Sequence, residues 1–372
     1  MSDYLIVGAG ISGASLAHLI SQSDASARID VIDRRDTIAG NCFDFRDENG
    51  IMIHRYGSHI LHTSDRGVWD FLCQLTKFNT YMHRVLAVIE GNKVPIPFNF
   101  DSIRLCFPPT LAERIERKLL DRFPYGSKIP IRDFMQQDDE DLKFLARYVY
   151  DNVFVHYTEK QWGTDPSKID GAVTARVPVY LSRDCRYFQD TCQGIPSEGY
   201  TGMIRKMLDH PNISVKLNTD FKDVKDIQRY RHIFFTGPID ELMDYSLGPL
   251  PYRSERFEFE THDREHYQEC AAVNYPNNYG FTRIHEYKYY LDDRSEKTVI
   301  AKEYPEDFII GKNERYYPVP TEESSELYSR YLEEAKKKYP SMRFLGRLGD
   351  YRYYDMDKAV ARAMAVFREV FE

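Results

Sequence analysis

The sequence predicts an α/β protein in which a discontinuous Rossmann-like dinucleotide-binding domain carries an inserted helical bundle and an antiparallel β-sheet domain. Three observations predict this fold. A glycine-rich turn at residues 8–13 directly follows the apolar run at residues 4–7. Apolar residues recur at helical spacing between about 101 and 175, and short β-rich runs lie between about 215 and 310. The 372 residues suffice for more than one hydrophobic core.

The glycine-rich turn, Gly8-Ala9-Gly10-Ile11-Ser12-Gly13, predicts a bound dinucleotide. Its three glycines would allow a sharp turn, the approach of a pyrophosphate to bare backbone, and close packing of a helix on the sheet. The helix that follows would offer unpaired N–H groups to the phosphates. The second strand ends in Asp33, where a carboxylate can bond the adenosine ribose hydroxyls. An ordinary strand-turn-helix unit is the alternative.

The sequence after Asp33 favours FAD over a nicotinamide cofactor. Residues 34–42 resemble the loop that, in flavoproteins of the glutathione-reductase type, runs from the ribose-binding acid back beneath the flavin. The stretch Arg55 to Thr63 then supplies a tight turn flanked by the imidazoles of His59 and His62. No second G-x-G-x-x-G occurs, so we expect FAD alone. Either histidine could instead be a hydrogen-bonded core residue.

Three domains are expected, with the FAD-binding domain interrupted by the other two. Their ranges are 1–78 with about 185–240 and 318–372 for the FAD-binding domain, about 101–178 for a helical bundle with a mobile lid, and about 79–100 with 241–317 for the sheet domain. Pro95 and Pro97 limit the strand at residues 93–98 to a sheet edge. Two apolar stripes predict the bundle helices: Leu111, Ile115, Leu119 and Leu120, and Leu142, Leu145, Val149 and Val153.

Composition narrows the possible partners and surroundings. The net charge of −8 argues against nucleic acid, and any anionic substrate must be held by local arginines. No apolar run approaches 18 residues and no signal-peptide pattern occurs, so we expect no membrane insertion and a cytoplasmic protein. The six cysteines are scattered and are expected to be reduced thiols, and no metal-ligand spacing occurs.

The end of the chain is expected to complete the cofactor site. Arg347 follows a late strand at residues 343–345 and could reach the flavin pyrophosphate. The closing helix, Asp355 to Phe371, would direct its positive end toward the O2/N1 edge of the isoalloxazine and stabilise the anion of the reduced flavin. The alternative is an ordinary surface turn before a helix capped by Asp355.

Four stretches together resemble those of a single family. They are GSHILHT at 57–63, YTEKQWG at 157–163, QGIPSEGYT at 193–201, and the segment 346–356 from Gly346-Arg347 to Asp355-Met356. The chain resembles the prokaryotic UDP-galactopyranose mutase family from end to end and in the same order. The YTEKQWG stretch is the most specific of the four.

The resemblance implies flavin chemistry without net oxidation on a nucleotide sugar, the interconversion of UDP-galactopyranose and UDP-galactofuranose. In that family reduced FAD acts through its N5, which attacks the anomeric carbon as UDP departs. An external reductant for FAD and a homodimer are expected as well. The alternatives are the same ring contraction on an N-acetylated, deoxy or dTDP-linked sugar and, in a different class, an FAD amine oxidase.

The resemblance also assigns site residues by matching position. Catalytic roles fall to Arg176 and Arg283, which would grip the pyrophosphate, and to His59 and His62 beside the flavin. Residues 164–170 would form a lid that brings in Arg176. The cofactor-binding residues are Gly8, Gly10, Ile11, Ser12, Gly13, Asp33, Arg34, Gly40, Asn41, Tyr56, Gly57, Ser58, His59, Ile60, Arg347, Tyr354, Asp355 and Met356. The substrate-binding residues are Asn79, Phe154, Tyr157, Thr158, Trp162, Arg176, Tyr187, Arg253, Asn274, Arg283, Tyr316, Tyr317, Tyr353 and Asp355.

Residue chemistry supports the diphosphate clamp, because guanidinium forks bind phosphate oxygens bidentately and lysine fits that geometry less well. Several assignments have plainer alternatives: Trp162 as simple packing, the two arginines as surface ion pairs, and Tyr316 in place of Tyr317. The chain departs from the family pattern at several positions, which could alter the sugar or base accepted: Ile11-Ser12, Asp33, Ala39, Cys192 and Tyr81-Met82-His83.

Overall fold

The computed structural model describes residues 3–163 and 178–372. Its first sheet has five parallel strands in the order β11-β2-β1-β12-β18. The strands are β1 (Tyr4–Val7), β2 (Ile29–Ile32), β11 (Ile213–Lys216), β12 (His232–Phe235) and β18 (Met342–Phe344). Segments from the beginning, middle and end of the chain therefore meet in one sheet, as expected for a discontinuous Rossmann-like fold.

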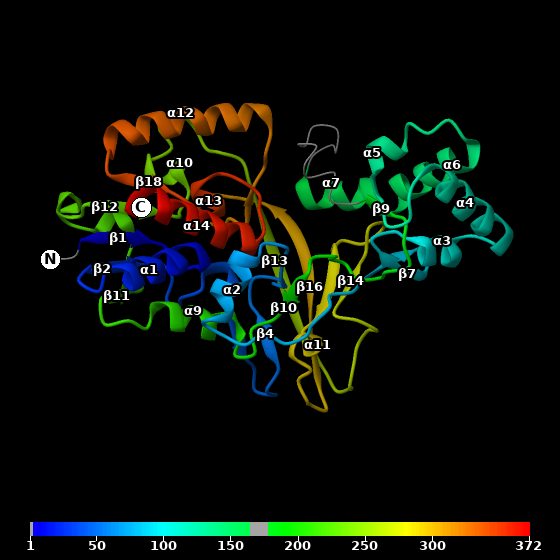
Figure 1. The fold of residues 1–372 in the computed structure, drawn as a ribbon, viewed down its shortest axis with the longest axis horizontal. Coiled ribbons are helices and arrows are strands. Elements are labelled where there is room, and N and C mark those ends of the chain that lie inside the picture. Colours follow the sequence, from blue (N-terminus) through cyan, green and yellow to red (C-terminus); the bar gives the residue numbers. More distant parts are fainter. Residues whose placement is uncertain (1–2, 164–177) are drawn as a thin grey trace.

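Helices cover both faces of this sheet. The helices are α1 (Ile11–Ser23), α9 (Gly199–Leu208) and α14 (Met356–Phe371) on one face, and α10 (Ile239–Leu242) and α12 (Glu322–Lys338) on the other. The alternation of strand side chains explains both cores: Ile6 is buried with α1 and α14, whereas its neighbour Leu5 is buried toward α12. Figure 1 shows α12 lying over the sheet on the side away from α9.

The second sheet has seven strands in the order β17-β13-β16-β15-β14-β6-β7. They are β6 (Val85–Ile89), β7 (Asn92–Ile96), β13 (Tyr252–His262), β14 (Ala272–Asn274), β15 (Arg283–Glu286), β16 (Thr298–Asp307) and β17 (Tyr317–Pro318). The strand containing Pro95 lies at the sheet edge, as predicted. All pairings are antiparallel except that of β14 with β6, which departs from the expected antiparallel sheet. These two strands are far apart in the chain, so no hairpin turn dictates their direction.

The helical part follows β7. It contains α3 (Phe100–Cys106), α4 (Pro109–Arg122), α5 (Ile131–Phe134), α6 (Glu140–Val149), the π-helix η2 (Tyr150–Val155) and α7 (His156–Trp162), with a small ladder between β8 (Lys128–Pro130) and β9 (Pro178–Tyr180). Both predicted stripes face one core, except that Leu120 is 45% exposed. Leu120 directly follows the buried Leu119, and successive helical residues do not share a face.

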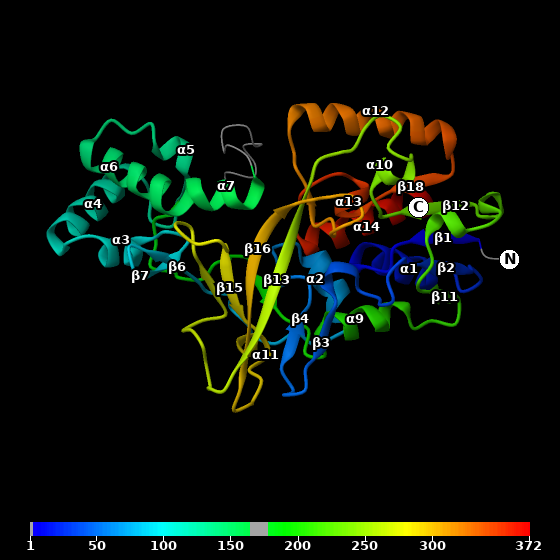
Figure 2. The ribbon, with the colours of Figure 1, turned by 180° about the vertical axis from the view of Figure 1, so that it is seen from behind.

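Shorter elements connect these parts. They are β3 (Asp44–Arg46), β4 (Met52–His54), β5 (Leu61–Thr63), α2 (Arg66–Cys73), β10 (Cys192–Gly194), α11 (Lys288–Leu291), α13 (Gly346–Gly349), and the 3-10 turns η1 (Gly40–Cys42), η4 (Phe221–Asp223) and η5 (Ile227–Arg229). Figures 1 and 2 place the seven-stranded sheet between the parallel sheet and the helical part. Within the described ranges, no helix combines the length and apolar character needed to cross a bilayer. The assignment of these parts to separate domains stays a prediction.

Candidate active site

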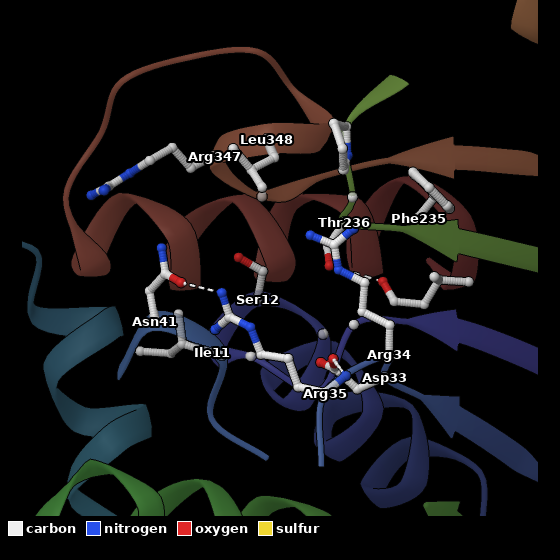
Figure 3. A pocket seen from close by; sticks show the side chains of 18 of the residues that line it. Ile11, Ser12, Asp33, Arg34, Arg35, Asn41, Phe235, Thr236, Arg347 and Leu348 are labelled. Atoms are coloured by element: carbon white, nitrogen blue, oxygen red, sulfur yellow. Dashed lines mark hydrogen bonds between the residues drawn. The ribbon is translucent and has the colours of Figure 1, made fainter. Parts of the chain in front are cut away.

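The glycine-rich turn lines a cavity at the carboxyl ends of the parallel strands (Figure 3). Gly8 has φ +110°, and a Cβ at this position would lie 1.9 Å from the hydroxyl oxygen of Thr236. A Cβ at Gly13 would lie 2.0 Å from the carbonyl oxygen of Gly8. Larger residues are therefore excluded by packing at both positions. At Gly10, which lines the cavity, a Cβ would make only ordinary contacts of 3.7 to 3.9 Å with Ala39 and Gly40, so packing does not by itself require glycine there.

Asp33 fastens the turn from the end of β2. One carboxylate oxygen accepts a hydrogen bond from the N–H of Ala9 at 2.8 Å, and the other accepts from the N–H of Arg35 at 2.9 Å. The Arg35 guanidinium donates to the side-chain oxygen of Asn41 at 3.0 Å and lies 4.5 Å from the centre of the Tyr56 ring. Hydrogen bonds and the contact with Tyr56 thereby hold the loop at 34–42 along the cavity, and Asp33 is among the residues that line it.

The opposite wall comes from the end of the chain. Figure 3 shows Arg347 and Leu348 across the cavity from Asp33 and Arg35. The Arg347 guanidinium donates to the carbonyl oxygen of Tyr354 at 2.8 and 3.1 Å. Asp355 occupies the N-cap position of α14, and it lines the cavity together with Met356 and Ala359 of the first turn. The positive end of α14 therefore opens on the cavity, where it favours bound negative charge.

His59 and His62 lie near the same end of the cavity. The N–H of His59 donates to Nδ1 of His54 at 3.0 Å, and burial lowers the pKa of His59 to about 3, which keeps its ring neutral. His62 lies with Nδ1 2.9 Å from Asp190 and Nε2 3.9 Å from Asp355. The structure thus brings His62 beside the start of α14.

A chain of polar groups, buried at its centre and partly exposed at its ends, runs from the loop that contains His59 to α7. Ser58 Oγ lies 2.6 Å from Nδ1 of His285, whose Nε2 lies 2.8 Å from a carboxylate oxygen of Glu303. The other oxygen of Glu303 lies 3.1 Å from Nε of Arg283. The Arg283 guanidinium then donates to the Tyr157 hydroxyl at 2.5 Å. Five side chains therefore connect the loop that contains His59 with the YTEKQWG helix.

Three aromatic rings gather at the end of α7. Trp162, Tyr317 and Tyr353 contact one another edge to face, with ring centroids 5.1 to 5.4 Å apart. Arg253 donates to the carbonyl oxygens of Gln161 at 3.0 Å and Lys160 at 3.1 Å, which satisfies groups left unpaired at the helix end. The guanidinium of Arg253 therefore binds the end of α7, and it also forms an ion pair with Asp307.

Lys160 joins α7 to the loop between β14 and β15. Its ammonium donates to four backbone carbonyl oxygens at 2.6 to 3.2 Å, those of Tyr275, Asn277, Tyr279 and Phe281. Burial lowers the pKa of Lys160 to about 8, whereas four accepting carbonyl groups favour the charged ammonium. One side chain therefore holds the whole loop against the helix that carries Tyr157 and Trp162.

The remaining predicted substrate residues are dispersed. Phe154 lies in the core of the helical part at 2% exposure, and Thr158 is buried at 5%. The side-chain amide of Asn79 bonds the N–H of Ile195 and the carbonyl oxygen of Tyr290. Asn274 is the register partner of Arg283, and its side-chain oxygen is buried without a hydrogen bond among the described residues. Tyr187 contacts His83 and Phe188, and Tyr316 packs near Phe257. Arg176 and the expected lid at 164–170 lie outside the described residues.

The sequence analysis did not name four polar residues that lie in or beside the polar chain from Ser58 to Tyr157. They are Gln161, Glu255, His285 and Glu303. Gln161 stands inside the YTEKQWG motif and donates to Glu255 at 2.9 Å. Glu303 directly follows the run 298–302, which was expected to be a strand, and it is 3% exposed. A charged residue within an otherwise buried strand was the available signal.

Comparisons with known proteins identify the family. A family model described as UDP-galactopyranose mutase matches residues 152–353, and one described as an NAD(P)-binding Rossmann-like domain matches residues 6–75. A "Probable UDP-galactopyranose mutase" of Klebsiella pneumoniae is 36% identical over 366 residues, which cover 97% of this chain and 93% of that protein. This chain belongs to the UDP-galactopyranose mutase family. It is therefore an enzyme of the isomerase class, and the resemblance carried by the four motifs is confirmed.

The chain is also similar to a mutase named for another nucleotide sugar and to several solved structures. A dTDP-fucopyranose mutase of Escherichia coli is 34% identical over 372 residues, covering 98% of this chain and 97% of that protein. The fold is shared with a crystal structure of a reduced UDP-galactopyranose mutase at a TM-score of 0.74 and 16% identity, covering 100% of this chain and 94% of that one. A putrescine oxidase variant aligns at a TM-score of 0.60 and 11% identity, covering 99% of this chain and 98% of that one. At such identities the structures show a common fold alone.

Proposed function

We propose that the protein interconverts UDP-galactopyranose and UDP-galactofuranose with FAD bound in the cavity of Figure 3. The observation that carries this proposal is the pairing of Arg283 with Tyr157, at one end of a polar chain whose other end is Ser58. This arrangement puts a guanidinium and a phenol within one connected network that begins beside the cavity. A nucleotide sugar bound there would have its diphosphate at Arg283 and its sugar toward the cofactor.

The cavity fits FAD on three counts. Gly10 lines the cavity with backbone that a pyrophosphate could approach, Asp33 lines it where a carboxylate would bond the ribose, and the positive end of α14 would stabilise negative charge on the isoalloxazine. When bound in its reduced form, FAD supplies N5 as the nucleophile toward the anomeric carbon. The cofactor-binding roles given above to Arg34, Asn41, Tyr56, Arg347 and the other residues of that set belong to this proposal.

The side chains of this protein would manage the leaving group. The diphosphate must be stabilised on departure yet kept close for the return step, and a guanidinium fork does both. Glu303 lies 3.1 Å from Nε of Arg283 and balances its charge, while the guanidinium donates to the Tyr157 hydroxyl. We assign Trp162 and Tyr317 to the same end of the substrate, because their rings share one cluster beside this pair.

His62 and Asp355 would act at the sugar end. His62 is held by Asp190, stacks on Phe188 at a centroid distance of 3.5 Å, and points its second nitrogen toward Asp355. Asp355 lines the cofactor cavity, so the pair stands where cofactor and sugar would meet. We assign both residues to positioning the sugar for attack. The protein is further proposed to work in the cytoplasm as a homodimer and to receive electrons from an external reductant.

A second substrate is favoured by a specific observation, the 34% identity with a dTDP-fucopyranose mutase over nearly the whole chain. The two candidates differ in base and in the C6 substituent of the sugar. Purified protein reduced with dithionite and given a panel of nucleotide furanoses, separated by chromatography, would distinguish them. Conversion of UDP-galactofuranose under reduction, and none without reductant, supports the proposal. Conversion of dTDP-linked sugars alone supports the second candidate, and oxygen consumption with an amine refutes both.

The Arg283→Ala variant tests the clamp. We expect a loss of at least roughly 100-fold in kcat/KM, because removal of a charged hydrogen-bonding group from a buried site costs about 3 kcal/mol or more. The matched control is Arg256→Ala, an exposed arginine on β13 whose ion pairs lie on the surface. Full activity of Arg283→Ala with an unchanged melting temperature would refute the assigned role.

A further inference from the structure

Strand register puts two acids and one arginine on a single face of the seven-stranded sheet. Phe257 on β13 is the register partner of Glu303 on β16, and Glu303 is the partner of Arg283 on β15. Glu255 precedes Phe257 by two residues, and residues two apart in a strand share a face. Glu255, Glu303 and Arg283 therefore project to the same side.

This face looks toward the loop beside the cofactor cavity. A Cβ placed on Gly57 would lie 2.9 Å from the Phe257 ring and 3.9 Å from one carboxylate oxygen, Oε2, of Glu255. On its other side Glu255 meets α7, because its Oε1 accepts from Gln161 at 2.9 Å and from the Tyr317 hydroxyl at 3.3 Å. Glu255 thus stands between the cofactor loop and the helix that carries Tyr157.

The two acids are not equivalent. Glu303 lies 3.1 Å from Nε of Arg283 and also bonds His285 at 2.8 Å and the Thr282 hydroxyl at 3.2 Å. Glu255 has partners on Oε1 alone, and its Oε2 makes no hydrogen bond with the described residues. Among the described residues, Arg283 is the guanidinium that faces both acids, and one guanidinium does not neutralise two carboxylates in a site shielded from water, so one acid retains its proton. The richer set of partners identifies Glu303 as the ionised acid and Glu255 as the protonated one.

We propose that Glu255 is a further substrate-binding residue, which in its protonated form donates a hydrogen bond from Oε2 to the diphosphate. This rests on the proposed nucleotide-sugar function. The diphosphate brings negative charge to Arg283, and an ionised Glu255 would repel that charge, whereas a protonated Glu255 adds a donor.

The surroundings of Glu255 agree with this protonation. Burial raises the pKa of Glu255 to about 8, the charge of Glu303 adds to that shift, and Arg283 opposes it. In the part of the chain that the structure describes, the other ionisable groups around it are Tyr157 on α7 and Tyr316 and Tyr317 at β17, together with Arg253 on its own strand. The three phenols are neutral near pH 8, because burial raises the pKa of each of them above its usual value.

The proposal links substrate affinity to pH with a definite sign. Because the bound form carries the proton on Glu255, the dissociation constant stays level below the pKa of the free enzyme and rises up to tenfold per pH unit above it. With a pKa of about 8, the dissociation constant at pH 9 is expected to be roughly tenfold that at pH 7.

The test titrates the oxidised holoenzyme, which should not turn over, with UDP-galactose by calorimetry from pH 6.5 to 9. In Glu255→Gln, which keeps the size and a donor but cannot ionise, we expect the ratio of dissociation constants between pH 9 and pH 7 to fall to about one. Glu258→Gln, on the exposed part of β13, is the matched control and should keep the tenfold ratio. Burial lowers the pKa of Lys160 to about 8 as well, but Lys160 is present in all three proteins, so the difference between wild type and Glu255→Gln reports on Glu255. A ratio in Glu255→Gln equal to that of wild type overturns the proposal.

A second variant protects the test against misfolding. Glu303→Gln removes the neighbouring negative charge, so Glu255 should ionise at a lower pH and the rise in dissociation constant should begin earlier. An unchanged or later onset contradicts the proposal. Failure of the proposed function would look different: UDP-galactose would not bind at any pH, and the same titration with dTDP-galactose would then decide between the two candidate substrates.

Discussion

The cofactor cavity and the Arg283 cluster are two sites constructed on opposite principles. The cavity is shaped by backbone, with Gly8 and Gly13 packed so closely that a single added carbon would collide with neighbouring atoms. The cluster is shaped by side chains, with Arg283 and Glu303 paired on adjacent strands of a sheet. The cavity therefore depends on steric fit, and the cluster depends on the balance of buried charges.

This difference determines how each site responds to substitution. A steric cradle tolerates no extra volume but carries little electrostatic cost, because its donors are backbone N–H groups. A buried charged cluster tolerates changes in volume better than changes in charge, since an unpaired ion in a weakly polar interior is expensive. Substitutions that add a methyl group in one region and remove a charge in the other would test this contrast.

The largest effect is expected for Gly13→Ala. The new Cβ would lie 2.0 Å from the Gly8 carbonyl oxygen, so α1 must move away from β1 and the pyrophosphate cradle opens. We expect loss of bound flavin, measured by the absorbance of the purified protein, and destabilisation of about 1–3 kcal/mol, typical of overpacking. Gly67→Ala in the exposed first turn of α2 is the control and should retain flavin at the wild-type level. Normal flavin content in Gly13→Ala would contradict the steric account.

The same contrast explains how much the sequence could predict. The sequence could predict the cavity because the elements that form one of its walls follow one another in the chain. A strand, three glycines, a helix and Asp33 lie within about thirty residues. The sequence could not predict that Glu255 and Glu303 lie together, because the two acids meet only through the register of β13 and β16. Nothing in the local pattern fixes that register, which follows from the packing of the whole sheet.

The family resemblance supplied part of what the local pattern could not. Tyr157 and Arg283, more than a hundred residues apart, were named from motifs, and the structure places them in direct contact. Their roles toward a substrate stay predictions. The parallel pairing of β14 with β6 was not foreseen, because it depends on contacts between segments distant in the chain. The exposure of Leu120 was a local misassignment, since successive helical residues do not share a face.

The next largest effect concerns the buried charge. Glu303→Gln leaves Arg283 without its closest carboxylate, and because the Arg283 side chain is 30% exposed the loss is expected to cost about 1–3 kcal/mol. Ionisation of Glu255 would partly replace the lost negative charge, so the loss in the free energy of unfolding should lie toward the lower end of this range. The control is Glu306→Gln on the same strand, whose pair with Arg256 is exposed and is worth at most about 1 kcal/mol. Urea denaturation of both variants measures the difference, and equal losses would remove the distinction between the two pairs.

A smaller effect is expected for Lys160→Met. The substitution keeps the length of the side chain but removes the donor to four carbonyl oxygens, and hydrogen bonds to charged groups are worth about 1.5–3 kcal/mol. We expect faster amide hydrogen exchange in the loop 275–281 and a raised KM, with little change in the cofactor cavity. Lys143→Met, at an exposed pair on α6, should alter neither quantity. An unchanged exchange rate in the loop would show that other contacts hold it.

The smallest single-site effect uses pH to compare the two regions. His54 lies beneath the cofactor loop and His83 lies beside Tyr187, and burial lowers the pKa of each to about 3. Below about pH 6.5 the unfolded chain binds protons that the folded protein cannot, so the free energy of unfolding falls as the pH falls toward 3. Each histidine should contribute up to about 1.4 kcal/mol per pH unit.

His54→Gln and His83→Gln should each flatten this slope by a similar amount when unfolding is measured at pH 7 and pH 5.5. The exposed His156→Gln serves as the control and should leave the slope unchanged. The two variants then separate the regions, because His83 also feels the positive charge of Arg283 whereas His54 does not. In a Glu303→Gln, Glu255→Gln background neither acid can replace the lost counter-charge of Arg283, so protonation of His83 becomes still less favourable while that of His54 should change less. Identical responses of both histidines to that background would contradict the electrostatic separation of the two sites.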